Sequence, residues 1–114
     1  MERRNEILEL SFEFALDIII FTELLEEQKK YIIARQLLKS GTSIGANVRE
    51  SQNSESKADF IHKLKIAAKE AEETAYRLLL CQHSPSYPYN PDLTTKLISI
   101  KKLLSSIISK MKTQ

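Results

Sequence analysis

The strongest constraint on the fold is an apolar repeat that runs unbroken through both glycines of the chain. Its members follow one another at spacings of three and four residues: Ala34, Leu37, Gly41, Ile44 and Val48. This spacing places them on one side of a single α-helix. Each glycine inside a helix costs about 1 kcal/mol relative to alanine. We therefore predict one continuous helix, in which a backbone contact too close for a Cβ atom compensates the cost of the glycines.

Small side chains on the same stretch form a candidate close-packing motif. Its members are Gly41, Ser43, Gly45, Ala46 and Asn47. Such a surface suits either close contact with another helix, which we favour, or contact with a ligand from outside. It is not a phosphate-binding loop, because the glycines lie within a helix and are not followed by Lys-Ser or Lys-Thr.

Helical periodicity covers most of the chain and predicts four helices, at about residues 4–27, 28–52, 57–82 and 92–112. The third helix carries an unbroken apolar seam, and Ser56 with Asp59 resembles a capping box at its start. The only proline-rich segment, His83–Asp92, is predicted to be a spacer rather than a docking peptide. No segment resembles a strand. We expect an all-α fold, an antiparallel up-down-up-down four-helix bundle, as a single domain over residues 1–114.

The first helix is apolar around more of its circumference than a monomeric bundle requires. We expect one face to enter its own core and another to meet a second subunit. Glu9, Glu13 and Asp17 interrupt its apolar run, which argues against a signal peptide, a transmembrane span or a membrane partner. The single cysteine fits a reducing compartment. The expected location is the cytoplasm.

Charge is distributed unevenly along the chain. Residues 1–27 contain eight acidic and two basic residues, whereas residues 28–114 contain seven acidic and fifteen basic residues. The basic remainder could meet an anionic partner, or it could complement the acidic first helix within the chain or between subunits. We favour the second explanation, because the net charge is only +2.

The sequence offers little for catalysis. A di-iron bundle needs Glu-x-x-His motifs, and neither His62 nor His83 follows a glutamate at that spacing. Cys81 is more typical of a small core residue than of a zinc ligand. Ser40 and Ser43 have no evident catalytic base. We expect a non-enzyme with no metal, cofactor or small-molecule substrate.

A basic stripe on the second helix makes nucleic acid the remaining functional candidate. The candidate nucleic-acid-binding residues are Lys29, Lys30, Arg35, Lys39 and Arg49. A ring of subunits would repeat this stripe and add weak phosphate contacts. The alternative is that these are ordinary solvated side chains on a helix surface.

Two stretches together resemble a known bacterial family. They are residues 36–50, which read QLLKSGTSIGANVRE, and residues 56–74, which read SKADFIHKLKIAAKEAEET. Both are similar to the "four helix bundle protein" family, also called large-subunit rRNA intervening-sequence proteins and related to the accessory protein of diversity-generating retroelements. The resemblance implies a homopentameric bundle without an established biochemical function.

Taken together, these features predict a non-catalytic homo-oligomer, in which the subunits themselves are the first partner and RNA or a nucleoprotein the second. The alternative is a protein–protein scaffold that binds no nucleic acid.

Overall fold

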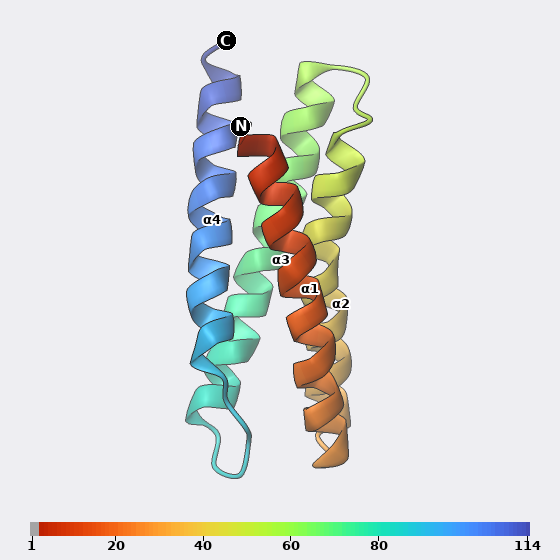
Figure 1. The fold of residues 1–114 in the computed structure, drawn as a ribbon, viewed down its shortest axis with the longest axis vertical. Helices are drawn as coiled ribbons and strands as arrows, with labels where there is room; N and C mark the ends of the chain where they lie inside the picture. The colour runs from red at the N-terminus through yellow and green to blue at the C-terminus, as the bar shows by residue number, and fades with distance from the viewer. Residues whose placement is uncertain (1–2) are drawn as a thin grey trace.

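The computed structural model describes residues 3–114, with side chains from Glu6 onward. It contains α1 (Arg3–Glu27), α2 (Tyr31–Ser51), α3 (Lys57–His83) and α4 (Pro91–Lys112), and the described residues form no strand. The helices run alternately down and up in a rod of 48 × 21 × 21 Å (Figure 1). Each packs against its two neighbours in the order α1, α2, α3, α4, and α4 closes back on α1. The predicted up-down-up-down bundle is confirmed.

The core is built from one apolar seam on each helix. On α2 all five predicted seam residues, Gly41 among them, are buried, Gly45 is half-buried, and the seam ends with the buried Ser51. On α3 the predicted unbroken seam is confirmed by seven buried residues at spacings of three and four: Phe60, Leu64, Ala67, Ala71, Thr74, Leu78 and Cys81. On α4 the apolar seam is buried from Leu93 as far as Ile107, whereas Met111 is only half-buried. Leucine and isoleucine therefore dominate a thin core, as the composition requires.

Local capping explains where the last two helices begin. Ser56 caps α3, and its side chain accepts a hydrogen bond from the Asp59 backbone N–H at 3.0 Å. Asn90 caps α4 in the same manner through the Asp92 N–H, also at 3.0 Å. Pro91 then stands at the first position of α4, where its missing N–H has no helical partner to lose. These caps confirm the predicted start of α3 and move the start of α4 one residue earlier than predicted.

The predicted start of the second helix at residue 28 is wrong by three residues. The chain reverses at Lys29, which adopts a left-handed conformation with φ of 65°. The Lys30 N–H then bonds to the Leu25 carbonyl (2.8 Å), and the Lys29 N–H bonds to the Glu26 carbonyl (2.9 Å). This pair of bonds is a Schellman motif, which usually has glycine at the left-handed position. A lysine there gives no sequence signal for the break.

Candidate nucleic-acid interface

The outer face of α2 carries three of the predicted nucleic-acid-binding residues. Arg35, Lys39 and Arg49 are all exposed, and none forms an ion pair with a described residue. Arg35 and Arg49 are fourteen residues apart, about 21 Å along the helix, and point in nearly the same direction. The structure therefore gathers these three side chains into an extended basic strip, which we call the α2 strip.

The other two predicted residues lie outside this strip. Lys29 and Lys30 occupy the turn before α2 rather than the helix itself. The Lys30 ammonium donates a hydrogen bond to Ser86 Oγ (3.3 Å) and lies 4.7 Å from the centroid of the Tyr87 ring. Lys30 thereby connects the loop between α3 and α4 to the turn between α1 and α2. Lys29 is exposed at the same end of the bundle.

The two glycines of the close-packing motif face α1. A Cβ atom on Gly41 would lie 2.9 Å from the side chain of Ile18, and one on Gly45 would lie 3.3 Å from the Ser11 carbonyl oxygen. At both positions an added Cβ would crowd α1, and the Gly45 neighbour is backbone that cannot rotate away. Among the described residues no ion pair joins α1 to α2. This helix pair is therefore held by close packing.

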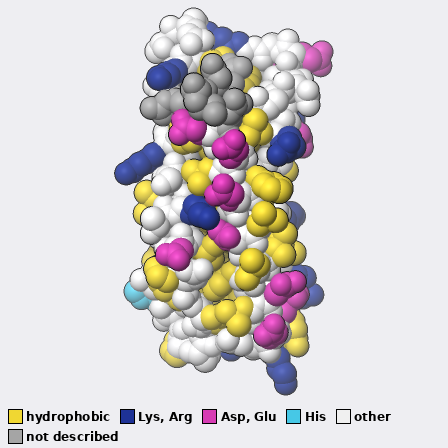
Figure 2. All heavy atoms as spheres, in the orientation of Figure 1, with side chains coloured by type: hydrophobic (Ala, Val, Ile, Leu, Met, Phe, Trp, Pro, Cys, Tyr) yellow, Lys and Arg dark blue, Asp and Glu magenta, His cyan; other side chains and the backbone are white. Residues whose placement is uncertain are grey.

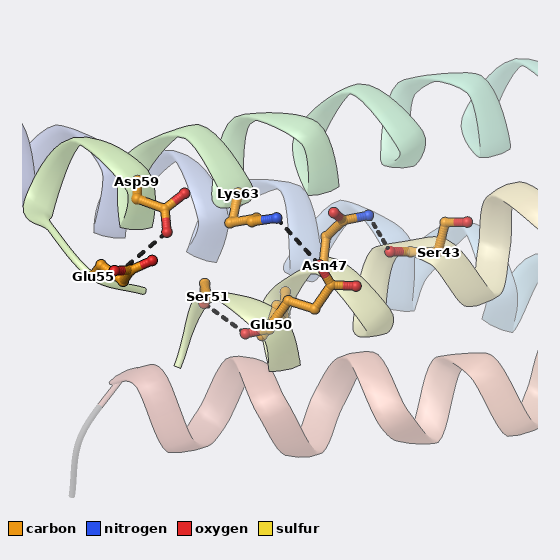
Figure 3. Close-up of polar contacts among 8 residues, drawn as sticks. Ser43, Asn47, Glu50, Ser51, Glu55, Asp59 and Lys63 are labelled. Carbon is orange, nitrogen blue, oxygen red and sulfur yellow. Dashed lines mark hydrogen bonds and ion pairs between the residues drawn. The ribbon is translucent and has the colours of Figure 1, made fainter. Parts of the chain in front are cut away.

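The remaining motif members take other positions. Ser43 and Asn47 are half-buried, and Ala46 is exposed on the outer side of the helix. The Ser43 hydroxyl donates to the Lys39 carbonyl (2.6 Å), and the Asn47 side-chain amide donates to the Ser43 carbonyl (2.9 Å; Figure 3). Both side chains thus bond to their own helix. Only the glycines of this motif make the close contact with α1.

Polar contacts tie α2 to α3 at two levels. In the core, the hydroxyl groups of Ser40 and Thr74 are hydrogen-bonded at 2.9 Å. Nearer the surface, the Lys63 ammonium lies 3.2 Å from a Glu50 carboxylate oxygen (Figure 3). Ser40 therefore has a structural partner, and no described histidine or carboxylate orients it as a nucleophile. Nothing in the sequence indicated that Ser40 pairs with Thr74.

Ion pairs also join α4 to both of its neighbours. Lys96 lies 2.6 Å from Asp17 on α1, and Lys101 lies 3.0 Å from Glu72 on α3. The Lys96 ammonium donates a hydrogen bond to the Asp17 carboxylate, and this bond is the main cause that raises the pKa of Lys96 above its ordinary value. These ion pairs neutralise the charges of Lys96 and Lys101 at the edges of α4. The α2 strip has no such neutralisation among the described residues.

A groove that sequence reasoning missed runs between the C-terminal half of α1 and residues 88–99. Its carboxylates are Asp17, Glu23, Glu27 and Asp92, and Lys96 is its basic residue. Ile20 and Leu24 add apolar surface from α1. Such a lining attracts cations and repels phosphate, so the groove is the wrong place for nucleic acid. Residues 17–27 and 88–99 are distant in sequence, which hid their convergence.

The two side chains considered for metal or redox chemistry differ in burial. Cys81 is buried, and this burial raises the pKa of its thiol, whereas His83 is exposed on the last turn of α3. Residues 3–114 contain no group of three potential metal ligands. In the same residues, no helix is long and apolar enough to cross a membrane.

The comparison with known families decides what kind of bundle this is. A family model described as "23S rRNA-intervening sequence protein" matches residues 3–106. The chain belongs to this family. The resemblance drawn from residues 36–50 and 56–74 is therefore confirmed.

A solved structure supports the same assignment for this intervening-sequence protein. It is a Bacteroides thetaiotaomicron protein of unknown function from the S23 ribosomal protein family, determined at 1.70 Å resolution. The two are 41% identical with a TM-score of 0.88, and the alignment covers 95% of this chain and 99% of the other. No curated protein matches the chain. The fold and family are thus shared with this Bacteroides protein.

Proposed function

We propose that this protein is a non-catalytic bundle that assembles with copies of itself in the cytoplasm and binds structured RNA. The single observation that carries the RNA part is the α2 strip. Its three basic side chains are exposed and unneutralised by any described residue, and they extend along about 21 Å of helix. Phosphate contacts of this kind provide affinity without sequence specificity. The family name refers to 23S rRNA, so RNA is the first anionic partner to test.

Three basic residues on one subunit bind RNA weakly. An assembly that repeats the α2 strip would convert the later contacts into intramolecular ones and raise the overall affinity. Self-assembly itself is supported by the outer face of α1, where Phe12 and Ile20 are 55% and 66% exposed. Large apolar side chains gathered on one helix face mark an interaction surface. We expect a ring, with the five subunits that the family resemblance implies.

The RNA part is tested by titrating a structured RNA with the protein at several salt concentrations. We expect the affinity to fall steeply with salt, and the double variant Arg35→Glu/Arg49→Glu to lower the salt slope by about 2. The matched control is Lys102→Glu/Lys110→Glu, which changes the net charge equally at exposed positions on α4. Absence of binding at low salt, or equal weakening by both double variants, would contradict the proposal.

The rival function is a protein–protein scaffold without RNA. The exposed apolar face of α1 favours this rival, because apolar surface binds proteins better than it binds phosphate. Affinity purification followed by native mass spectrometry separates the two. RNA retained on the assembly supports the proposed function, whereas a stable foreign protein with no bound RNA supports the scaffold. The same spectrum reports the number of subunits.

A further inference from the structure

Two faces of the bundle are unpartnered and carry opposite charge. The acidic face, on the outside of α1, combines Glu9 and Glu13 with the exposed apolar residues Phe12, Leu16 and Ile20. Figure 2 shows acidic and hydrophobic side chains gathered in this way on the side of the molecule that carries α1. A helix face that only meets solvent is typically charged and has no reason to carry large apolar residues. A protein partner with basic and apolar groups would pair with the glutamates and cover the apolar side chains.

The basic face lies on the outside of α3. It combines Lys65 and Lys69 with the exposed apolar residues Tyr76 and Leu79. Lys112 stands close enough to Lys65 to lower the pKa of the Lys65 ammonium, so two like charges are crowded here. An acidic partner would relieve that repulsion.

One acid also points to this side of α3. It is Glu72, and Lys101 neutralises it at 3.0 Å. The basic face therefore keeps its positive sign. Because α1 and α3 lie diagonally across the bundle, the acidic and basic faces lie on different sides of the molecule.

The two faces match in height along the bundle. Helices α1 and α3 run in the same direction (Figure 1). Gly45 lies against Ser11, and Ser40, five residues from Gly45 and about 7.5 Å further down the bundle, bonds to Thr74. At 1.5 Å per residue, Ser11 is then about level with Lys69.

The correspondence in height between Ser11 and Lys69 also gives the levels of the other residues on both faces. It places Glu9 between the levels of Lys65 and Lys69, and it places Tyr76 between the levels of Leu16 and Ile20. A second copy placed alongside with a parallel axis would therefore meet acid with base near one end, and apolar with apolar in the middle.

We infer that the acidic face of one copy docks on the basic face of a second copy, with the two bundles parallel. This inference rests on the self-assembly in the proposed function and names its surfaces. A symmetric contact between two acidic faces would oppose glutamates to glutamates, and one between two basic faces would oppose lysines to lysines. A contact between unlike faces leaves one acidic face and one basic face free on every dimer. Further copies can therefore add until a ring closes or a filament forms. It also leaves the α2 strip exposed for RNA.

Cysteine cross-linking tests the pairing and its register. Wild-type protein is the blank, because its single cysteine is buried. With a short bis-maleimide, the double variant Ile20→Cys/Tyr76→Cys is expected to give a ladder of dimers, trimers and higher species. Each single variant should give no cross-link, and the two single variants refolded together should give dimers only. The register control is Ile20→Cys/Lys65→Cys, whose new thiols lie about 16 Å further apart along the bundle axis.

Several results would overturn the inference. One is the formation of cross-linked dimers by Ile20→Cys alone. Another is more efficient cross-linking of Ile20→Cys/Lys65→Cys than of Ile20→Cys/Tyr76→Cys. The third is a protein that is oligomeric although Ile20→Cys/Tyr76→Cys gives no ladder. Circular dichroism confirms that each variant is folded, so a negative result cannot be assigned to misfolding.

Charge reversal separates this inference from RNA binding. Lys65→Glu/Lys69→Glu and Glu9→Lys/Glu13→Lys should each lose the assembly, and mixing the two should restore association in complexes that alternate the two variants, because the reversed faces complement each other. If the Lys65→Glu/Lys69→Glu variant keeps its oligomeric size but loses RNA binding, the basic face is an RNA surface and the inference fails. A wild-type monomer that still binds RNA in an Arg35- and Arg49-dependent way overturns the inference while the RNA part of the proposed function stands.

Discussion

Ile18 of α1 occupies the space that a side chain on Gly41 of α2 would need. An ideal Cβ at Gly41 would lie 2.9 Å from both Cγ1 and Cγ2 of Ile18, a separation that packed carbon atoms do not adopt. Ile18 is fully buried and, as a β-branched residue, has little rotamer freedom. The glycine is thus a requirement of the α1–α2 contact, although it lowers the intrinsic stability of α2.

The first prediction concerns this contact. Gly41→Ala gains about 1 kcal/mol of helix propensity but overpacks the interface by about 1–3 kcal/mol, so we expect a net loss of unfolding free energy. Gly45→Leu should destabilise by about 1–3 kcal/mol, because its Cβ already approaches the Ser11 backbone. Urea unfolding measures both changes.

Two controls sharpen this prediction. Ala46→Gly, at an exposed position of the same helix, should cost about 1 kcal/mol from propensity alone. Ile18→Ala should cost less in the Gly41→Ala background than in the wild type, because the clash disappears with the isoleucine. Equal costs in both backgrounds would show that the two residues do not compete for space.

The second prediction concerns the buried Ser40–Thr74 hydrogen bond. Thr74→Val keeps the shape of the side chain but removes one hydroxyl, so we expect a loss of about 1–2 kcal/mol in unfolding free energy. The double variant Ser40→Ala/Thr74→Val should lose less unfolding free energy than the two single variants lose in sum. With both hydroxyl groups removed, no buried hydroxyl is left without its partner. Strict additivity in chemical denaturation would argue that the bond contributes nothing.

The third prediction concerns the left-handed residue between α1 and α2. Lys29 has φ of 65°, a conformation that costs a residue with a Cβ about 1 kcal/mol or more. Lys29→Gly should therefore raise the unfolding free energy by about 1 kcal/mol, with a higher melting temperature. Lys29→Ala removes the same charge but keeps the Cβ, so it should give no such gain. Equal effects of the two substitutions would assign the change to charge instead.

The fourth prediction is a pH dependence of the Lys96–Asp17 ion pair. Asp17 raises the pKa of Lys96 above its ordinary value of 10.5. The folded state therefore holds this proton more tightly than the unfolded state does, and the stabilisation is present below pH 10.5 and lost as the pH rises through the folded pKa. Both side chains are about one-third exposed, so the contribution should stay below about 1 kcal/mol.

The measurement compares wild type with Lys96→Met by urea unfolding near neutral pH and above the raised pKa. We expect Lys96→Met to be the less stable protein at neutral pH and the difference to shrink in alkaline solution and in high salt. A difference that persists unchanged in alkaline solution would assign the effect to packing of the lysine stem rather than to its charge.

Much of the fold was predictable because helical periodicity is a local property. The spacing of the α2 seam identified one helix through two glycines, and Ser56 with Asp59 marked the start of α3. The turn before α2 was not predictable, because the bonds from Lys29 and Lys30 back to α1 stabilise a left-handed lysine that gives no propensity signal. The α2 strip followed from spacing as well, since Arg35, Lys39 and Arg49 are fixed relative to one another by a single helix.

The sequence by itself determined the four helices, their buried stripes and the family, because each depends on residues close together in the chain. Tertiary structure alone decided which surfaces converge. It placed Ile18 against Gly41, joined Ser40 to Thr74, and brought Asp17 to Lys96 from opposite ends of the chain. It also set α1 and α3 diagonally and at matching heights, which places the acidic and basic faces on different sides of the molecule. Those relations depend on how the helices pack, and no single stretch of sequence encodes packing between distant segments.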